Sequence, residues 1–379
     1  MTTDDERSAT HAAESALPAS NLVPSRRFTT FAEAWRLGYQ EVYSVAIVDR
    51  IIRACEKRRI KSCWPLAVVT VAAWPFWLNL VLFLVERPFA VTSPTSLALL
   101  AGLAALDALM LFAAWSAWTV CHRRSRLIDR TLKTQSDREV IARSILRRIS
   151  HWRQAAPPCL AVAFGLLFLY FSSKQLKTGM GIDISFTSYV CVAWTSFLGG
   201  NVTYWLFTVP SLPRLLYLCP SLTLRWQDPA STPAIRLLAD GFGVSALFLL
   251  AGTATVLAIA VWLPGFSDVT ALRVLLDGFF LLFTILSFRV GLYTYAWMYA
   301  MVKREKQRAL DAIERAMPPL SRLSEKKIRE AATAWVPLYS SISSARDLPF
   351  STAAVVQYTA ALLGAVLTFV IQQIITASH

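Results

Sequence analysis

The chain has 379 residues, of which 55% are hydrophobic and 16% are charged, and its formal net charge is +14. Its mean hydropathy of +0.46 is typical of polytopic membrane proteins and excludes an ordinary soluble domain. The basic residues gather beside predicted helices, which favours contact with anionic lipids at a membrane face over nucleic-acid binding.

The chain begins with a polar segment, and no apolar run occurs before Trp64. This pattern lacks a cleavable signal peptide, so we expect residues 1–27 to be a disordered tail. A capping-box pattern at Thr30 and Glu33 then predicts an amphipathic helix within residues 28–61.

Seven apolar stretches follow, each near the ~20 residues that cross a bilayer. They lie at 63–85, 96–121, 156–172, 185–208, 241–264, 271–301 and 350–376. We therefore predict an all-α membrane protein with transmembrane helices 1 to 6 in residues 62–301 and helix 7 in residues 349–379.

The distribution of Lys and Arg predicts the orientation of these helices. Residues 7–61, 122–154 and 302–349 contain ten Lys or Arg each, whereas the outer connections contain very few. The N-terminus, the connections 122–155 and 209–240, and an anchor-like helical segment at 302–348 are thus expected in the cytoplasm. The C-terminus is expected outside a plasma or inner membrane.

No motif of enzymatic or cofactor chemistry is present: the sequence lacks a Walker A motif, G-x-S-x-G, H-E-x-x-H and G-x-G-x-x-G. The six cysteines are scattered without C-x-x-C pairs, so neither a disulfide framework nor a zinc site is indicated. We expect no enzyme, no cofactor and no metal.

The last predicted span carries a stripe of small and hydrogen-bonding residues at helical spacing. The stripe consists of Gln357, Ala361, Gly364, Thr368 and Gln372. Such a stripe either lets another helix approach closely or lines a wet path through the membrane. Helix packing is the commoner use, and both interpretations stay open.

Two charged residues fall at membrane depth, Asp107 in the second span and Arg289 in the sixth. Counted from the predicted cytoplasmic ends of their helices, both lie ~20 Å from the inner face, so an ion pair is geometrically possible. Such a pair either fixes the register of two helices or provides a gate or counter-ion for a substrate.

The topology resembles that of the insect odorant and gustatory chemoreceptor superfamily. In the final span of that family a Thr-Tyr pair is followed by apolar residues and then Gln-Phe; here Thr368-Phe369 and Gln372-Gln373 stand in the matching stretch. The resemblance implies a tetrameric cation channel in which Gln357, Thr368 and Gln372 face a central pore. It also implies a ligand pocket among the first six spans, and cytoplasmic helices that join the subunits.

These observations favour a homo-oligomeric, ligand-responsive ion channel that opens to an unknown small molecule. One alternative is a small-molecule transporter that uses Asp107 and Arg289. Another is a membrane scaffold or signalling protein that transports nothing.

Overall fold

The computed structural model of this chain describes residues 48, 50–52, 54, 64–85, 93–123, 125–149, 151–180, 184–262, 269–317, 326–349 and 352–377. The structure is 90% helical, and the described part contains no strand, which confirms the all-α prediction. The predicted tail 1–27 and most of the predicted helix 28–61 lie outside this part. Two described residues of that helix, Val48 and Ile52, are buried in the main core.

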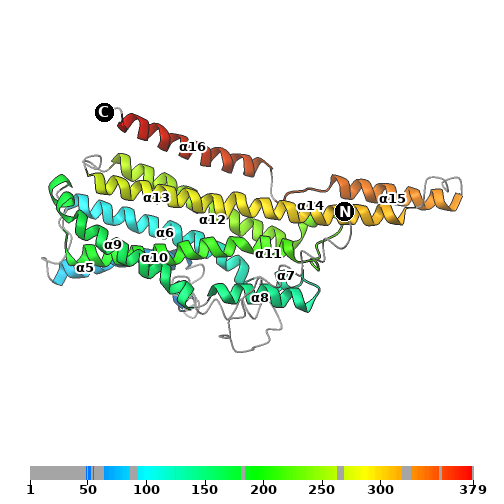
Figure 1. Cartoon of the computed structure of the whole chain (residues 1–379), viewed down its shortest axis with the longest axis horizontal. Helices are drawn as coiled ribbons and strands as arrows, with labels where there is room; N and C mark the ends of the chain where they lie inside the picture. The colour runs from blue at the N-terminus through cyan, green and yellow to red at the C-terminus, as the bar shows by residue number, and fades with distance from the viewer. Residues whose placement is uncertain are drawn as a thin grey trace, which may run out of the picture.

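Long helices run side by side through the body of the molecule (Figure 1). They are α6 (Pro94–Arg123), α9 (His151–Met180), α10 (Phe186–Thr208), α12 (Pro233–Trp262) and α13 (Thr270–Phe288). The most extensive contact joins α6 and α12. There Phe112 stacks on Phe248 with ring centres 5.1 Å apart, and the Ser245 hydroxyl donates to the Ala113 carbonyl at 2.5 Å. Aromatic packing and one buried hydrogen bond thus fix this central pair.

The first predicted span is bent. It consists of α4 (Trp64–Ala72) and α5 (Trp74–Val85), whose axes meet at 60°. Pro75 lies just after the break, and its ring clashes with the carbonyl four residues earlier, which interrupts helical hydrogen bonding. The apolar span predicted over 63–85 is therefore a broken helix.

Small residues bring α9 and α10 close together. A Cβ added at Gly200 would lie 2.7 Å from the Pro158 Cα and 2.9 Å from the Pro157 carbonyl oxygen. A Cβ at Gly165 would lie 2.3 Å from the Ser196 hydroxyl. Glycine at these two positions allows the close backbone approach that is typical of membrane helix pairs.

Four helices in the described ranges are long and apolar enough to cross a membrane, or five if the bent pair α4–α5 counts as one span. The predicted seventh span, α16, counts only as a shorter apolar helix, Val355–Ile371, and the predicted fourth span, α10, does not pass this test either. Helix α10 buries Thr187, Thr195 and Asn201 against its neighbours. A helix that other helices shield from lipid can carry such polar residues, because hydrogen bonds within the protein satisfy them.

The connections at one end of the bundle pack on each other. This end contains α7 (Ser125–Asp129), α8 (Gln135–Ile149), η2 (Val209–Ser211), α11 (Leu212–Leu218) and η3 (Pro229–Ser231). Asp137 accepts hydrogen bonds from the Ser221 backbone and hydroxyl, and Leu132 forms an isolated bridge with Leu222. This packing buries Leu212 and Leu216 of the 209–240 connection, whereas Leu218 is 61% exposed.

Helix α13 continues without a break through the π-helical turn η4 (Arg289–Tyr293) into α14 (Thr294–Ala316), and these 47 residues form one long helix. Its far end projects beyond the bundle and pairs with α15 (Lys326–Ser344), as Figure 1 shows. Leu310, Ile313 and Ile342 form a small separate core between α14 and α15. The last helix, α16 (Thr352–Ala377), lies along one side of the bundle, beside α13 (Figure 1).

Candidate functional site

Helix α16 contacts the rest of the chain along one face, which we call the docking face. Tyr358 and Leu362 on this face are each only 6% exposed. The Tyr358 hydroxyl lies 2.6 Å from the Ser287 hydroxyl and donates to the Ser287 carbonyl at 2.7 Å. Farther along, Phe369 stacks on Phe280 with ring centres 4.0 Å apart.

A second polar contact holds the other end of the docking face. The Gln373 side-chain oxygen accepts a hydrogen bond from Arg273 at 3.0 Å, and its amide nitrogen donates to Asp277 at 2.9 Å. Directional contacts near both ends and an aromatic stack between them fix the rotation of α16 about its own axis.

The stripe predicted from the sequence lies outside the docking face. Gln357, Ala361, Gly364 and Thr368 are all exposed, and no atom of the described residues lies within 4 Å of a Cβ added at Gly364. The Thr368 hydroxyl donates to the Gly364 carbonyl of its own helix at 2.9 Å. The side chain of Gln372 lies outside the described part. Among the described residues, the stripe from Gln357 to Thr368 therefore packs against no other helix of the chain.

A third side of α16 is exposed and apolar. It carries Val356, Leu363, Leu367 and Ile374, whose side chains are 61–66% exposed. At 3.6 residues per turn the docking face, the stripe and this apolar side are separated by about a third of a turn each. The apolar side suits lipid, so the stripe differs in chemistry from the lipid-facing surface.

The two charged residues predicted to pair have separate partners. Asp107 is 2% exposed and accepts a hydrogen bond from the Thr195 hydroxyl at 2.9 Å. The Arg289 guanidinium carbon lies 3.7 Å from the centre of the Tyr293 ring. No ion pair joins Asp107 to Arg289, although the structure describes both side chains, so the predicted intramembrane pair is corrected.

The reason is that the two residues lie at different levels of the bundle. Arg289 is an electrostatic neighbour of Arg148, whose backbone carbonyl accepts a hydrogen bond from Tyr204. Asp107 instead contacts Thr195, which precedes Tyr204 by nine residues on α10. At 1.5 Å per residue that separation is about 14 Å along the axis.

Removing the donor to Asp107 tests this buried contact. We expect Thr195→Val to lower the free energy of unfolding by about 1–3 kcal/mol, because a buried acceptor loses its hydrogen bond. The measurement is the thermal midpoint of the purified protein in nanodiscs. The control is Thr255→Val, which removes an exposed hydroxyl on α12. Equal midpoints for the two variants would contradict the assignment.

The π-helical turn η4 joins the docking face to a cluster of arginines. Its Gly291 is buried, and a Cβ added there would lie 2.6 Å from the Tyr358 hydroxyl. The Thr294 hydroxyl donates to the Gly291 carbonyl at 2.8 Å and also to that of Val290. Because π turns of this kind occur frequently at functional sites, η4 is a candidate functional element.

Arginine and aromatic side chains alternate from η4 along α14. Arg289 lies over Tyr293, the rings of Tyr293 and Trp297 are 6.2 Å apart, and Arg214 of α11 lies 5.6 Å from the Trp297 ring centre. The Tyr293 side chain interacts with both guanidinium groups. Each guanidinium group has five N–H donors, so these contacts leave donors for further hydrogen bonds.

Arg148 approaches the same group from α8. Its guanidinium donates hydrogen bonds to the Thr208 carbonyl at 3.3 Å and to the Ser211 hydroxyl, both neutral acceptors. Burial lowers the pKa of Arg148 from its ordinary value, and the neighbouring positive charge of Arg289 lowers it further. We call Arg148, Arg214 and Arg289 the arginine cluster.

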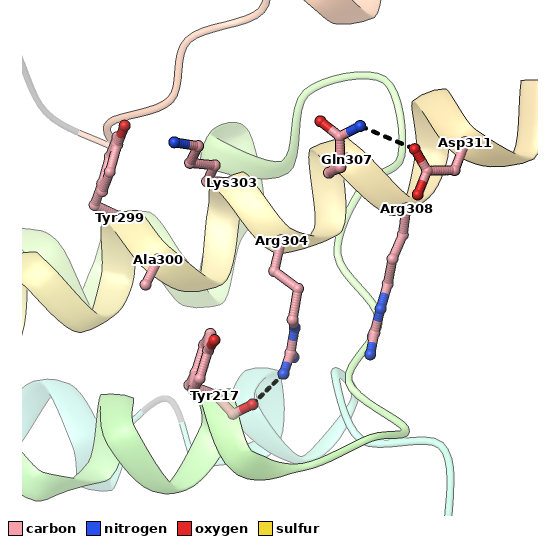
Figure 2. Close-up of a pocket in the computed structure, with 8 residues that line it drawn as sticks. All are labelled: Tyr217, Tyr299, Ala300, Lys303, Arg304, Gln307, Arg308 and Asp311. Atoms are coloured by element: carbon pink, nitrogen blue, oxygen red, sulfur yellow. Dashed lines mark hydrogen bonds between the residues drawn. The ribbon is translucent and has the colours of Figure 1, made fainter. Parts of the chain in front are cut away.

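A groove of about 510 Å³ lies beyond the cluster, between α11 and α14. It is lined by Tyr217, Tyr299, Ala300, Lys303, Arg304, Gln307, Arg308 and Asp311 (Figure 2). Arg304 donates to the Tyr217 carbonyl at the end of α11, where a positive charge stabilises the helix dipole. Arg304 and Arg308 also share Glu305, at 3.1 and 2.8 Å. Two of its cations thus already have structural partners.

Neither the docking residues of α16 nor the arginine cluster was predicted as a site from the sequence, although Arg289 was predicted as one half of a charge pair. Ser287 gives one available signal, since a hydroxyl inside an apolar helix needs a partner when it is buried. Arg148, Arg214 and Arg289 come from segments far apart in the chain, and no spacing rule connects them.

Within the described residues, no group of three or more His, Cys, Asp or Glu side chains could hold a metal ion. Comparison of the chain with protein-family models, curated proteins and solved structures gives no match.

Proposed function

We propose that the chain is a subunit of a homo-oligomeric ion channel in the plasma or inner membrane, and that the stripe of α16 faces the other copies or the pore. The observation that carries this proposal is the arrangement of α16. One face docks on the bundle, a second is apolar, and the described part of the small polar stripe, Gln357 to Thr368, has no partner among the described residues.

The seven-span topology belongs to the same proposal. We count α10 as the fourth span, shielded by its neighbours, and α16 as the seventh. The Lys and Arg distribution supports a cytoplasmic N-terminus. The projecting α14–α15 hairpin would then stand in the cytoplasm, where it would contribute to contacts between subunits as in the chemoreceptors that the topology resembles.

The small-molecule transporter is less well supported. That hypothesis required Asp107 and Arg289 to form one site, and the two side chains have separate partners at different levels. The membrane scaffold has no specific observation in its favour, so it serves as the alternative outcome of the experiment below.

The experiment is single-channel recording of the purified protein in planar bilayers. We expect Thr368→Val and Gln372→Leu to change unitary conductance by roughly twofold or more, because polar groups that line a pore determine its conduction. Leu363→Val on the apolar side of α16 is the matched control and should conduct as the wild type does.

Two outcomes would contradict the proposal. A folded wild-type protein that conducts nothing under any tested condition would favour the scaffold. If the stripe variants and Leu363→Val change the conductance equally, the stripe does not line the pore.

A further inference from the structure

The arginine cluster concentrates positive charge, and no carboxylate of the described residues forms an ion pair with it. Arg148 comes from α8, Arg214 from α11 and Arg289 from the π turn η4. Arg148 and Arg289 are close enough to affect each other electrostatically, and both Arg214 and Arg289 interact with Tyr293. Like charges this close repel one another, and the described part of the chain offers none of them an ion pair.

The contacts of the arginine cluster use only some of its guanidinium N–H donors. Arg214 lies over the Trp297 ring, Arg289 lies over the Tyr293 ring, and both guanidinium groups hydrogen-bond the Tyr293 side chain. Each guanidinium has five N–H donors, so donors remain for a ligand. Arg214 is exposed and Arg289 is half-buried. A ligand thus reaches the cluster from the surface of the molecule while part of the site stays shielded from water.

The number and direction of the donors indicate the ligand. A phosphate group presents three strong acceptor oxygens and up to two negative charges, so guanidinium groups arriving from three elements can each bind a different oxygen. A carboxylate has two oxygens and matches two forks at most. The neighbouring groove is a poorer site, because Arg304 and Arg308 are already paired with Glu305.

We propose that Arg148, Arg214 and Arg289 form a binding site for a phosphate-bearing anion. The anion is either the headgroup of an anionic lipid or a free phosphate compound. This proposal rests on the proposed function only for the idea that the bound anion is the channel's ligand, and binding is measurable without any conductance.

The site is well placed to influence α16. Arg289 opens the π turn, and Gly291 of the same turn contacts Tyr358 of the docking face. The arginine cluster and the attachment of α16 thus share one turn of helix. An anion bound at Arg289 would therefore interact with the same π turn that contacts Tyr358 of α16, the candidate pore helix.

The experiment uses the full-length protein in nanodiscs and has two arms. In the lipid arm, phosphatidylcholine nanodiscs are compared with nanodiscs that also contain phosphatidic acid. In the soluble arm, inorganic phosphate or pyrophosphate is titrated into phosphatidylcholine nanodiscs. Thermal midpoints and lipid retained in native mass spectrometry are the readouts. We expect a higher midpoint in one arm, which identifies a headgroup or a free phosphate as the source.

The variants are Arg289→Gln and Arg214→Gln, each compared with its lysine substitution. We expect the glutamine variants to bind the anion roughly tenfold more weakly or worse, and lysine to restore part of the loss because it keeps the charge without the fork. Arg147→Gln and Arg236→Gln replace exposed arginines outside the cluster and are the controls.

Arg214 is exposed, so we expect Arg214→Gln to fold. This variant alone tests the proposal if Arg289→Gln does not fold. The proposal is overturned if neither arm raises the midpoint of the wild type, or if the cluster variants bind as the controls do. If the cluster variants bind the anion more weakly but the anion does not change the conductance of the wild type, the phosphate site is supported. Only the idea that the anion is the channel's ligand is then contradicted.

Discussion

Gly200→Ala is expected to destabilise the protein more than any other single methyl group added to the described helices. The new Cβ would lie 2.7 Å from the Pro158 Cα, 2.9 Å from the Pro158 nitrogen and 2.9 Å from the Pro157 carbonyl oxygen. These are backbone atoms, which no rotamer change can move aside. Helices α9 and α10 must therefore separate, at an expected cost of about 3 kcal/mol or more.

The neighbouring glycine provides the control for this substitution. A Cβ added at Gly199 has no atom within 4 Å. We expect Gly199→Ala to be neutral or slightly stabilising, because alanine loses less backbone freedom in a helix than glycine does. The measurement is the thermal midpoint in nanodiscs, and equal midpoints for the two variants would contradict the close α9–α10 contact.

The second large effect is expected from Gly291→Ala, which should loosen α16. The added Cβ would lie 2.6 to 2.8 Å from three atoms of Tyr358, namely the hydroxyl oxygen, Cζ and Cε1. Tyr358 cannot withdraw without losing its hydrogen bonds with Ser287. Overpacking together with a lost buried hydrogen bond amounts to about 2–4 kcal/mol.

Hydrogen exchange of the α16 backbone measures this effect. We expect faster exchange over residues 352–377 in Gly291→Ala, while exchange in α6 and α12 changes little. Gly278→Ala is the control on the same continuous helix, because a Cβ at Gly278 meets no atom within 4 Å. Protection of α16 that matches the wild type would mean that Tyr358 does not dock at the π turn.

The all-α class was predictable because long apolar runs leave few alternatives, and the helices α6, α9, α12 and α13 lie where the sequence places apolar spans. The stripe on α16 was predictable from spacing alone, since residues that share one face of a helix do so wherever the helix packs. Spacing does not show which neighbouring helix each face contacts. The docking contacts of Tyr358 and Phe369 are therefore known only from the structure.

The Asp107–Arg289 pairing was wrong for a specific reason. Depth was counted from a helix end near Val302, yet the helix runs on without a break to Ala316. Nothing in the sequence of a continuous helix shows where it leaves the membrane. The depth of its residues in the bilayer therefore cannot be determined from sequence alone. The bend at Ala73 was missed although Pro75 gave a visible signal for it.

Assembly is the central claim, and the mass of the purified full-length protein in mild detergent or nanodiscs tests it most directly. We predict a homo-oligomer, with the tetramer expected from the sequence as the number of copies and the stripe of α16 at or beside the contact between copies. Thr368→Val should leave the monomer folded, since the Thr368 side chain is exposed. A wild-type protein that is monomeric at every concentration tested would contradict the central pore and, with it, the proposed function.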